Sequence, residues 1–591
     1  MSNQDEIGTP ATEAFRSARN QLLGWRGDHR AAVSGFRWPD VGDRFNWGID
    51  WFDAIARGND RSALVILEEA DERQGTPASS WSFDTLARRS DQVATLLVDH
   101  GVRKGDAVVV MLGNQVELWE AMLAIIKVGA VIMPTTTAVG PADLRDRITR
   151  GGATLVIANA SDTGKFDDVP GDYRKVVVSH ATEVPSGWEP FSAAYEIDAP
   201  PAPHPGTAPG DPVLLYFTSG TTSRPKLVEH TQVSYPVGHL TTMYWLGLEP
   251  GDVHLNISSP GWAKHAWSCF FAPWNAEATV FLYNYSRFDP EALLRVLRAN
   301  DVTTMCAPPT VWRMLINADL SGGSGRLREV ISAGEPLNPE VIEQVRRAWG
   351  LTIRDGYGQT ETTAQVGNTP GSLVKAGSMG RPLPGVPVVL VDPVTGERVE
   401  ADADGPREGE ICLDLSDAPL PLMTGYQGDP DRNAEAMSGG YYRTGDVASV
   451  DSEGYITYIG RTDDVFKASD YKISPFELES VLIEHPAVAE AAVVPAPDAV
   501  RGAVPKAYLV LAPGHEPTRE TALSVLMYAR EHLAPWQRIR RIEFAELPKT
   551  ISGKIRRVEL RQRENDAVAS DSAPPGAEWR DDQFPQLRSG G

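Results

Sequence analysis

The chain has 591 residues, too many for one hydrophobic core, and about one domain per 150 residues would give three or four compact units. Its composition is that of a globular protein, with 42% hydrophobic and 23% charged residues. The net charge of -23 argues against a nucleic-acid-binding surface but not against a nucleotide ligand, because a few local cations suffice for a nucleotide.

The cysteines and the N-terminus indicate the compartment. Cys269, Cys306 and Cys412 each stand alone in apolar sequence, which is typical of buried thiols in a reducing compartment. The N-terminus is polar, and no apolar run is long enough to span a bilayer. We therefore expect a cytoplasmic protein without a membrane partner.

Strands alternate with helices from about residue 82 to residue 353, a pattern that predicts right-handed crossovers and mostly parallel sheets. Residues 1–40 have few apolar anchors and are expected to be loosely ordered. The expected helices are Phe83–Val98, Val116–Val128, Pro141–Arg150, Pro290–Ala299, Pro309–Ile316 and Pro339–Trp349. The expected strands are Ala107–Leu112, Ala130–Met133, Thr154–Ile157, Val213–Phe217, Val302–Cys306, Val330–Ile331 and Thr352–Ile353.

The pattern changes near residue 380, where short β-prone runs separated by Pro, Gly and Asp predict a small antiparallel sheet or barrel. These runs are Val388–Val391, Gly409–Leu413 and Tyr455–Ile459. A compact α+β unit is expected from about residue 461 to 562. Its expected helices and strands are Ser474–His485, Thr518–His532, Ala491–Val494, Ala507–Leu511 and Arg541–Glu546. Residues 563–591 are expected to be a flexible tail with one weak docking segment at Trp579, Phe584 and Leu587.

The loop after the strand Val213–Phe217 is suited to bind a polyphosphate. It contains Thr218, Ser219, Gly220, Thr221, Thr222, Ser223, Arg224, Pro225 and Lys226. Hydroxyls and backbone N–H groups can surround phosphate oxygens, glycine allows a close approach, and lysine adds a mobile positive charge. It is not a Walker A loop, because no second glycine precedes the lysine and no Ser or Thr follows it. The alternative is a Ser/Thr-rich surface turn, since such turns are common.

Two later motifs carry groups that a nucleotide requires. The run Asp355–Thr362 offers Tyr357 as an aromatic face for a base and Glu361 as a carboxylate suited to Mg²⁺. In Tyr442–Asp446 the aspartate follows a Gly turn, where its carboxylate can accept both hydroxyls of a ribose.

Two further motifs lie nearer the C-terminus. Gly460–Asp464 falls at the junction of the last two units, and Pro548–Ile555 is a polar loop with a lysine after glycine. Taken singly, each motif also has a structural interpretation. Tyr357 could be a half-buried strand-end tyrosine, Glu361 a charge at a helix N-terminus, and Lys554 a surface lysine.

Taken together, in this order and spacing, the motifs resemble those of the adenylate-forming enzymes, which include acyl-CoA synthetases, firefly luciferase and the adenylation domains of peptide synthetases. The resemblance covers about residues 40–560. The segments Ser332–Pro339 and Tyr357–Glu361 are most similar to those of short- and medium-chain acyl-CoA synthetases.

This resemblance implies an α/β fold with a large N-terminal domain, residues 41–460, and a small mobile α+β C-terminal domain, residues 461–562. The N-terminal domain would hold two stacked, mostly parallel α/β subdomains and a small β-barrel-like subdomain. The C-terminal domain would rotate about a hinge at Asp463 between two reaction steps.

The resemblance also implies a two-step reaction that uses ATP, Mg²⁺ and, as co-substrate, CoA. A carboxylate attacks the α-phosphorus of ATP, giving an acyl-adenylate and pyrophosphate, and the CoA thiol then attacks the acyl carbon and releases AMP. Positioning and charge neutralisation supply most of the rate of the first step. The expected partners are the acid, ATP and CoA, with no nucleic acid, and a homodimer is left open.

The site residues follow by the same resemblance. Lys554 would neutralise charge at the α-phosphate and the attacking carboxylate, and Mg²⁺ would lie near Glu361 and Thr218. The implied ATP- and AMP-binding residues are Thr218, Ser219, Gly220, Thr221, Thr222, Lys226, Gly334, Glu335, Pro336, Asp355, Gly356, Tyr357, Gly358, Gln359, Thr360, Asp446 and Arg461.

The chain departs from the family pattern in the loop and in the CoA channel. Ser223 and Leu227 stand where the loop usually has glycine, and a positive φ would cost a non-Gly residue about 1 kcal/mol. Asp470, followed by Tyr471 and Lys472, stands where a glycine normally lets the pantetheine arm pass. A carboxylate there would raise a thiol pKa and put the CoA step in doubt. Alternatively, Asp470 turns outward and leaves the channel unaffected.

The acid pocket is the third departure. The segment with Trp262, Ala263, Lys264 and His265 corresponds to the residues that line the acyl pocket in the family. Lys264 and His265 favour a polar acid, because a buried lysine requires a partner. Alternatively, Lys264 points to the nucleotide phosphates or to solvent.

Three functions remain open from the sequence alone. The first is an AMP-forming acyl-CoA synthetase that acts on a short-chain, medium-chain or aromatic acid, with a polar acid as one possibility. The second is an adenylate-forming ligase with another acceptor, such as a diazotase that joins nitrite to an aromatic amine. The third is a catalytically silent binding protein, against which the presence of Lys554, Glu361, Asp446 and Arg461 argues.

Overall fold

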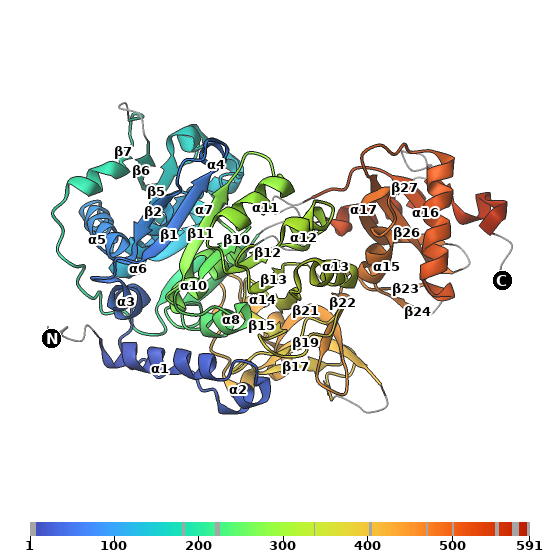
Figure 1. Cartoon of the computed structure of the whole chain (residues 1–591), viewed down its shortest axis with the longest axis horizontal. Coiled ribbons are helices and arrows are strands. Elements are labelled where there is room, and N and C mark those ends of the chain that lie inside the picture. Colours follow the sequence, from blue (N-terminus) through green and yellow to red (C-terminus); the bar gives the residue numbers. More distant parts are fainter. Residues whose placement is uncertain are drawn as a thin grey trace. The chain divides into compact units, whose positions relative to one another are not determined.

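The computed structural model describes residues 8–179, 184–218, 225–335, 337–400, 405–468, 471–498, 501–549, 555–569 and 578–587. The chain divides into two compact units, shown with their elements in Figure 1. The first unit contains residues 1–389, 413–442 and 454–456, and the second contains residues 390–412, 443–453 and 457–591. Each unit is described by itself below.

The first unit contains two large sheets, which confirm the expected α/β class with mostly parallel strands. The first sheet has nine described strands in the order β16-β15-β14-β13-β12-β10-β11-β1-β2. From β1 to β14 its neighbours are parallel, and β2, β15 and β16 pair antiparallel at the edges. The bounds are β1 Ser62–Glu68, β2 Ser79–Ser82, β10 Val253–Asn256, β11 Thr279–Asn284, β12 Thr304–Ala307, β13 Glu329–Ala333, β14 Arg354–Gly358, β15 Ala364–Gly367 and β16 Arg381–Pro382.

The second sheet of this unit has eight described strands in the order β20-β9-β8-β4-β3-β5-β6-β7. Its parallel strands run from β8 to β7, and β9 and β20 add an antiparallel edge. The bounds are β3 Ala107–Met111, β4 Val131–Pro134, β5 Ala153–Asn159, β6 Arg174–Val178, β7 Glu189–Pro190, β8 Pro212–Thr218, β9 Lys226–Thr231 and β20 Gly425–Tyr426.

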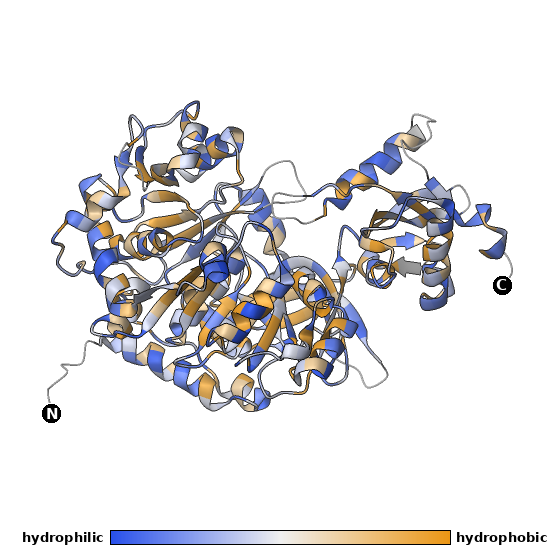
Figure 2. Cartoon of the chain, turned by 45° about the horizontal axis from the view of Figure 1, so that its top comes forward, coloured by the Kyte–Doolittle hydropathy of each residue, from blue (hydrophilic) through white to orange (hydrophobic). Residues whose placement is uncertain are grey.

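Helices of the first unit cover these sheets. In Figure 2 the strands are mostly hydrophobic, whereas the helices carry many hydrophilic residues. Helix α6 is almost wholly buried and ends at Gly129, which adopts the left-handed conformation that glycine favours. The helix bounds are α1 Pro10–Gly24, α2 His29–Gly35, α3 Ala54–Ala56, α4 Glu69–Gln74, α5 Phe83–Asp99, α6 Val116–Val128, α7 Pro141–Gly151, α8 His239–Leu246, α9 Ala263–Ala266, α10 Ala272–Asn275, α11 Pro290–Ala299, α12 Pro309–Ile316, α13 Pro339–Trp349 and α14 Pro430–Ala436.

A smaller sheet follows in the region where short β-prone runs predict one. It has five described strands in the order β18-β17-β19-β21-β22. Their bounds are β17 Val388–Val391, β18 Arg398–Val399, β19 Arg407–Asp414, β21 Tyr441–Val450 and β22 Ile456–Arg461.

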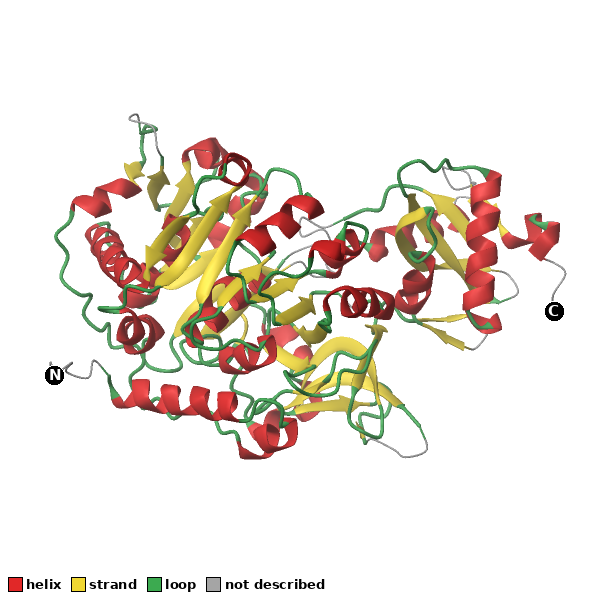
Figure 3. Cartoon of the chain, in the orientation of Figure 1, coloured by secondary structure: helices red, strands yellow, loops and turns green. Residues whose placement is uncertain are grey.

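The second unit ends in the expected α+β module, whose helices and strands Figure 3 distinguishes by colour. Its sheet is ordered β25-β26-β27-β28, and β23 and β24 form a separate hairpin. The bounds are β23 Phe466–Ala468, β24 Tyr471–Ile473, α15 Pro475–Leu482, β25 Val488–Asp498, β26 Gly502–Leu511, α16 Arg519–His532, β27 Arg541–Phe544, α17 Arg557–Ala569 and β28 Glu578–Arg580.

Both chain ends are more ordered than the sequence suggests. Residues 10–24 form α1, and Phe15 and Leu22 on this helix are fully buried. The ring of Phe15 lies 4.3 Å from that of Trp51. At the other end, β28 pairs with β27, and Phe584 is buried. Helices α1 and α2 correct the expectation of a loose segment at residues 1–40, for its described residues. The weak docking segment contains the short strand β28 with Trp579, followed by the buried Phe584 and Leu587.

Candidate active site

Thr218 and Lys226 border the polyphosphate-binding loop that the sequence predicts. Thr218 ends β8, Lys226 begins β9, and the two are register partners in the antiparallel pair. Residues 219–224 of the loop lie outside the described residues. The Thr218 hydroxyl oxygen is buried and has no hydrogen-bond partner in the part of the chain that the structure describes. An orphan hydroxyl of this kind calls for a ligand or water.

Lys226 and Glu361 come together with Tyr426. The Lys226 ammonium lies 3.8 Å from Oε1 of Glu361 and donates to the Tyr426 hydroxyl over 3.2 Å. The Tyr426 hydroxyl in turn donates to Glu361 Oε1 over 2.9 Å. Burial, followed by the charge of Glu361, raises the pKa of Tyr426, so this hydroxyl stays protonated as a donor. The structure thus places two opposite charges, those of Lys226 and Glu361, at the start of β9.

The run from Asp355 to Thr362 begins on β14, as part of a hairpin with β15. Gly356 and Gly367 are register partners, and a methyl group at either would overlap the Trp245 ring. Both glycines are therefore required to seat this tryptophan. Tyr357 is half-buried, and Gln359 accepts a hydrogen bond from the Tyr442 hydroxyl over 2.9 Å.

Glu361 is held by the backbone that surrounds it. His230 Nε2 donates to the Thr360 carbonyl over 2.8 Å, and the Met423 N–H donates to the Glu361 carbonyl over 2.8 Å. Burial lowers the pKa of His230 to about 4, so it remains neutral at physiological pH. These contacts come from β9 and from the segment before β20, which the sequence motifs do not indicate.

Asp355 is a buried acidic residue at the start of the run Asp355–Thr362. It accepts hydrogen bonds from the Gly356 N–H over 2.9 Å and from the Leu337 N–H over 3.4 Å. Burial raises its pKa to about 7, although both N–H donors and the charge of Lys264 oppose this shift. Asp355 thus ties β14 to the segment that begins at Gly334.

Lys264 does not point to solvent. It lies on the short helix α9, and its Nζ donates to the Ala333 carbonyl over 2.9 Å at the end of β13. The next two residues, Gly334 and Glu335, belong to the predicted nucleotide-binding segment, and Gly334 has a φ of 108°. The lysine therefore holds the end of β13 from the side of the predicted acid pocket.

His265 and Trp262 flank Lys264 in the predicted acid pocket. His265 Nε2 donates to Asn114 Oδ1 over 2.9 Å, and burial lowers the pKa of this histidine to about 3. It is therefore a neutral, fixed group. Trp262 is half-buried just before α9, and Ala263 is buried.

The predicted ribose-binding residues lie together in the second unit. Arg461 donates to Asp446 Oδ1 over 3.2 Å and to the Thr444 carbonyl over 3.1 Å. The Tyr458 hydroxyl approaches the same aspartate oxygen at 3.4 Å. Asp446 is 5% exposed and directly follows Gly445, which has a φ of 73°.

The predicted hinge residue Asp463 lies directly after this group. Its carboxylate is 3.7 Å from Arg461 Nε, and the neighbouring Asp464 forms ion pairs with Arg557 and Arg561 of α17. Lys554, Pro336, Asp470 and the loop residues Ser219, Gly220, Thr221 and Thr222 lie outside the described residues. The same holds for the side chains of Tyr471 and Lys472.

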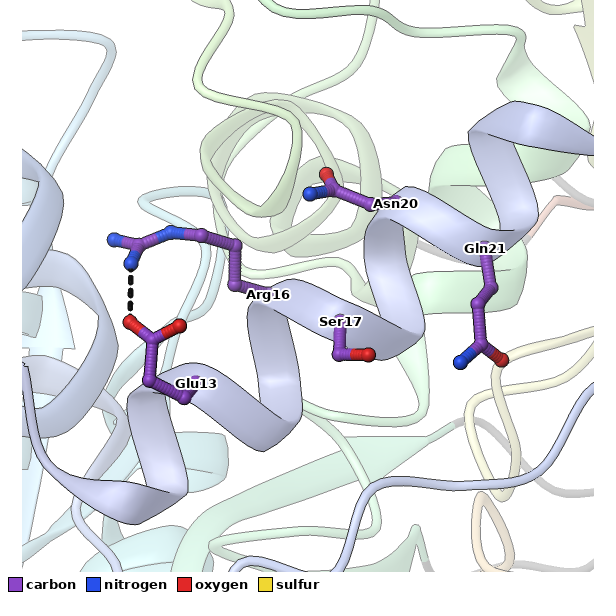
Figure 4. A pocket seen from close by; sticks show the side chains of 5 residues that line it. All are labelled: Glu13, Arg16, Ser17, Asn20 and Gln21. Atoms are coloured by element: carbon purple, nitrogen blue, oxygen red, sulfur yellow. Dashed lines mark hydrogen bonds and ion pairs between the residues drawn. The ribbon is translucent and has the colours of Figure 1, made fainter.

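The sequence motifs miss Tyr426 and Trp245, which hold the site residues in place. Neither lies in one of the motifs singled out in the sequence, so only the folded sheet reveals them. A separate hollow, drawn in Figure 4, lies against α1 and is lined by Glu13, Arg16, Ser17, Asn20 and Gln21. It contains none of the predicted site residues.

The chain matches the AMP-binding enzyme family over residues 51–426 and the AMP-binding enzyme C-terminal domain over residues 477–554. It belongs to the AMP-binding enzyme family. This confirms the resemblance seen in the sequence: the protein is an adenylate-forming enzyme of the acyl-CoA synthetase type.

Curated proteins and solved structures agree with this assignment. A 4-hydroxybutyrate–CoA ligase 1 from Metallosphaera sedula is 43% identical over 88% of this chain and 91% of its own length. The human mitochondrial acyl-coenzyme A synthetase ACSM3 is 37% identical over 82% of this chain and 83% of its own.

Among solved structures, a Brucella canis acyl-CoA synthetase has a TM-score of 0.67 and 33% identity and covers 93% of this chain and 99% of its own. An anthranilate CoA ligase in complex with anthranoyl-AMP has a TM-score of 0.78 and 26% identity, over 90% and 99%. In the described part of this chain, no helix has both the length and the apolar character needed to cross a membrane.

Proposed function

We propose that this enzyme joins a short hydroxylated carboxylic acid to CoA through an acyl-adenylate, with release of AMP and pyrophosphate. The observation that carries the proposal is the 43% identity with a 4-hydroxybutyrate–CoA ligase over most of both chains. The half-buried ammonium of Lys264 in the predicted acid pocket supports a polar rather than a plain alkyl acid. No observation favours nitrite as a substrate.

In the first step, a carboxylate oxygen of the acid attacks the α-phosphorus of ATP, and the bond to pyrophosphate breaks. Lys226, with the Thr218 hydroxyl across the strand pair, would bind the outgoing phosphates. The half-buried Tyr357 would stack on adenine beside Gly334. Lys554 would neutralise charge at the reacting oxygens.

The residues present fit a magnesium ion. Mg²⁺ in such sites uses one or two carboxylates together with substrate phosphates and waters. Glu361 supplies a carboxylate held by Tyr426, and Thr218 supplies a buried hydroxyl without a partner among the described residues. When bound, the ion would neutralise phosphate charge, while Tyr426 and Lys226 orient Glu361.

In the second step, the sulfur of CoA attacks the acyl carbon, and the bond from that carbon to AMP breaks. Asp446 would hold the ribose hydroxyls, with Arg461 beside it. We propose that the small domain, residues 461–562, turns about Asp463 between the steps relative to the large domain, residues 41–460. Residues 563–591 would form a C-terminal tail. Asp470, Tyr471 and Lys472 would border the CoA channel.

The remaining expectations are proposals from the sequence. They are a cytoplasmic location, no nucleic-acid or membrane partner, and a homodimer as the assembly to test by size-exclusion chromatography.

One assay tests the function. Pyrophosphate, AMP and acyl-CoA are measured with ATP, Mg²⁺ and a panel of hydroxy, alkyl and aromatic acids, with and without CoA. We expect acid-dependent AMP release and acyl-CoA formation. No AMP with any acid, or full turnover without CoA, would contradict the proposal.

A further inference from the structure

Lys264 has hydrogen-bonding capacity that the protein leaves unused. A lysine ammonium carries three donors. In the part of the chain that the structure describes, the Nζ of Lys264 makes one hydrogen bond, to the Ala333 carbonyl. The Lys264 side chain is half-buried, and a ligand with an acceptor atom could take a further donor of its ammonium.

Asn256 presents a second group with an unused hydrogen-bonding position, next to the thiol of Cys269. It ends β10, is 4% exposed, and donates from Nδ2 to the sulfur of Cys269 over 3.2 Å. Its Oδ1 is buried without a partner among the described residues. Burial raises the pKa of Cys269, and the charge of Lys264 opposes that shift. The amide and the ammonium therefore both act on one thiol, and we name Lys264, Asn256 and Cys269 the polar corner.

The polar corner has open space beside it. Lys264 holds Ala333, and at the next residue, Gly334, an added Cβ would meet no atom within 4 Å. On the other side, the half-buried Trp262 precedes α9. A substrate that enters beside Gly334 would reach an ammonium with unused donors and an amide oxygen that has no partner among the described residues.

We infer that the polar corner binds a hydroxyl group of the acid, with Lys264 donating to the hydroxyl oxygen and the hydroxyl donating to Asn256 Oδ1. A hydroxyl both accepts and donates, which matches one unfilled donor group and one unfilled acceptor. An alkyl end would leave the Asn256 oxygen and the remaining donors of Lys264 unfilled. The inference rests on the proposed function, because the polar corner is part of the acid site of that ligase.

The surrounding charges disfavour a second carboxylate on the substrate. The carboxylates of Glu335 and Asp355 both act on Lys264 and raise its pKa against the larger effect of burial. A dicarboxylic acid would bring one more negative charge to a lysine that these two groups already face. The polar corner therefore selects a neutral polar end.

The test compares acids that differ in one group. kcat/KM is measured for 4-hydroxybutyrate, butyrate, 4-fluorobutyrate and succinate with the wild type, Lys264→Met, Asn256→Leu and the surface control Lys104→Met. We expect the wild type to favour 4-hydroxybutyrate over butyrate by about 10- to 100-fold. Each pocket variant should lower this ratio at least about tenfold, and Lys104→Met should leave it unchanged.

The wild type alone also tests the inference if a variant fails to fold. Fluorine is close in size to a hydroxyl but donates no hydrogen bond, so 4-fluorobutyrate should behave as butyrate does, and succinate should be poor. A wild-type ratio of kcat/KM for 4-hydroxybutyrate to that for butyrate near one would overturn the inference but not the proposed function. The same holds if this ratio is unchanged in both folded variants. Absence of AMP release with every acid would instead overturn the proposed function.

Discussion

At the scale of single residues, the clearest electrostatic arrangement joins Lys226, Glu361 and Tyr426. We expect Glu361→Gln to lower adenylate formation by about 10²- to 10³-fold, because it removes the charge that would bind the metal and oppose the lysine. The Tyr426 hydroxyl can still donate to the glutamine oxygen, so the fold should persist. Pyrophosphate release over a range of Mg²⁺ concentrations measures the effect.

Glu340→Gln serves as the matched control, because this glutamate lies exposed in the first turn of α13. Its variant should keep wild-type rates and Mg²⁺ dependence. Equal rates for Glu361→Gln and the wild type would remove Glu361 from the catalytic site.

Asp355 gives a prediction about pH. Burial raises its folded-state pKa from 3.8 to about 7, so between these pH values the folded protein binds more protons than the unfolded chain. The stability contributed by this group is therefore present at low pH and lost as pH rises through about 7. We expect Asp355→Asn to flatten the fall in Tm between pH 4 and pH 7.

Asp84 is the control of opposite sign. Its pKa is lowered, with a hydrogen bond from the Gly58 N–H as the main cause and Arg88 as a lesser one. Asp84→Asn should lose stability at neutral pH and approach the wild type in acid. If Asp355→Asn shows the same pH profile of Tm as the wild type, Asp355 does not titrate in this range.

Residue types and spacing predict a chemistry for the site, but not the direction of each side chain. The sequence leaves Lys264 between the acid pocket, the phosphates and solvent, and only the fold shows its contact with Ala333. Tyr426 was missed because its two-residue strand has no pattern of its own; β9 and β20 bring it to Glu361.

At the scale of elements, the hairpin of β14 and β15 positions Asp355, Gly356 and Tyr357, the start of the motif proposed to bind adenine. A methyl group at Gly356 would overlap the buried Trp245 ring, whose Nε1 also donates to the Asp355 carbonyl over 3.2 Å. We expect Gly356→Ala to destabilise the protein by about 1–3 kcal/mol, as overpacking does. Gly210→Ala is the control, since a Cβ there meets no atom within 4 Å. Urea denaturation followed by tryptophan fluorescence compares them, and equal midpoints would contradict the packing argument.

The same hairpin shows the limit of strand prediction. Apolar residues place a strand at Thr352–Ile353, whereas the structure has β14 at Arg354–Gly358. Glycines and charged residues have a low strand propensity, but pairing with β13 and β15 overrides this low propensity in β14. The strongly apolar strands β3 and β5 and helix α6 were predicted within a few residues, because burial dictates their sequence.

At the scale of the whole molecule, alternating strands and helices were enough to predict the α/β architecture, and the chain ends were not predictable in the same way. Ala11, Phe15, Ala18 and Leu22 have helical spacing, but the segment is otherwise polar. Tertiary contacts such as those with Trp51 and Glu277 explain why it is ordered. The C-terminal strand β28 is likewise stabilised by tertiary contacts rather than by its own composition.

The last prediction concerns that strand. Lys506 is fully buried on β26, and its ammonium contacts Glu543 at 2.9 Å, Glu564 at 2.6 Å and Glu578 of β28 at 2.8 Å. Removing one partner from a buried charge group commonly costs about 3–5 kcal/mol, because the other charges stay buried without compensation. Lys506→Met leaves three carboxylates together, so we expect it to destabilise the second unit strongly.

Truncation after Ala569 removes β28 with Glu578 but leaves Lys506 two carboxylates, so its cost should be smaller than that of Lys506→Met. Hydrogen exchange localises the effect: β26 and β27 should exchange faster in both variants, while β3 and β5 of the first unit stay protected. Arg326→Met, which breaks an exposed ion pair with Asp301, should change neither set. Unchanged exchange in β27 after truncation would mean that β28 contributes nothing to the stability of this sheet.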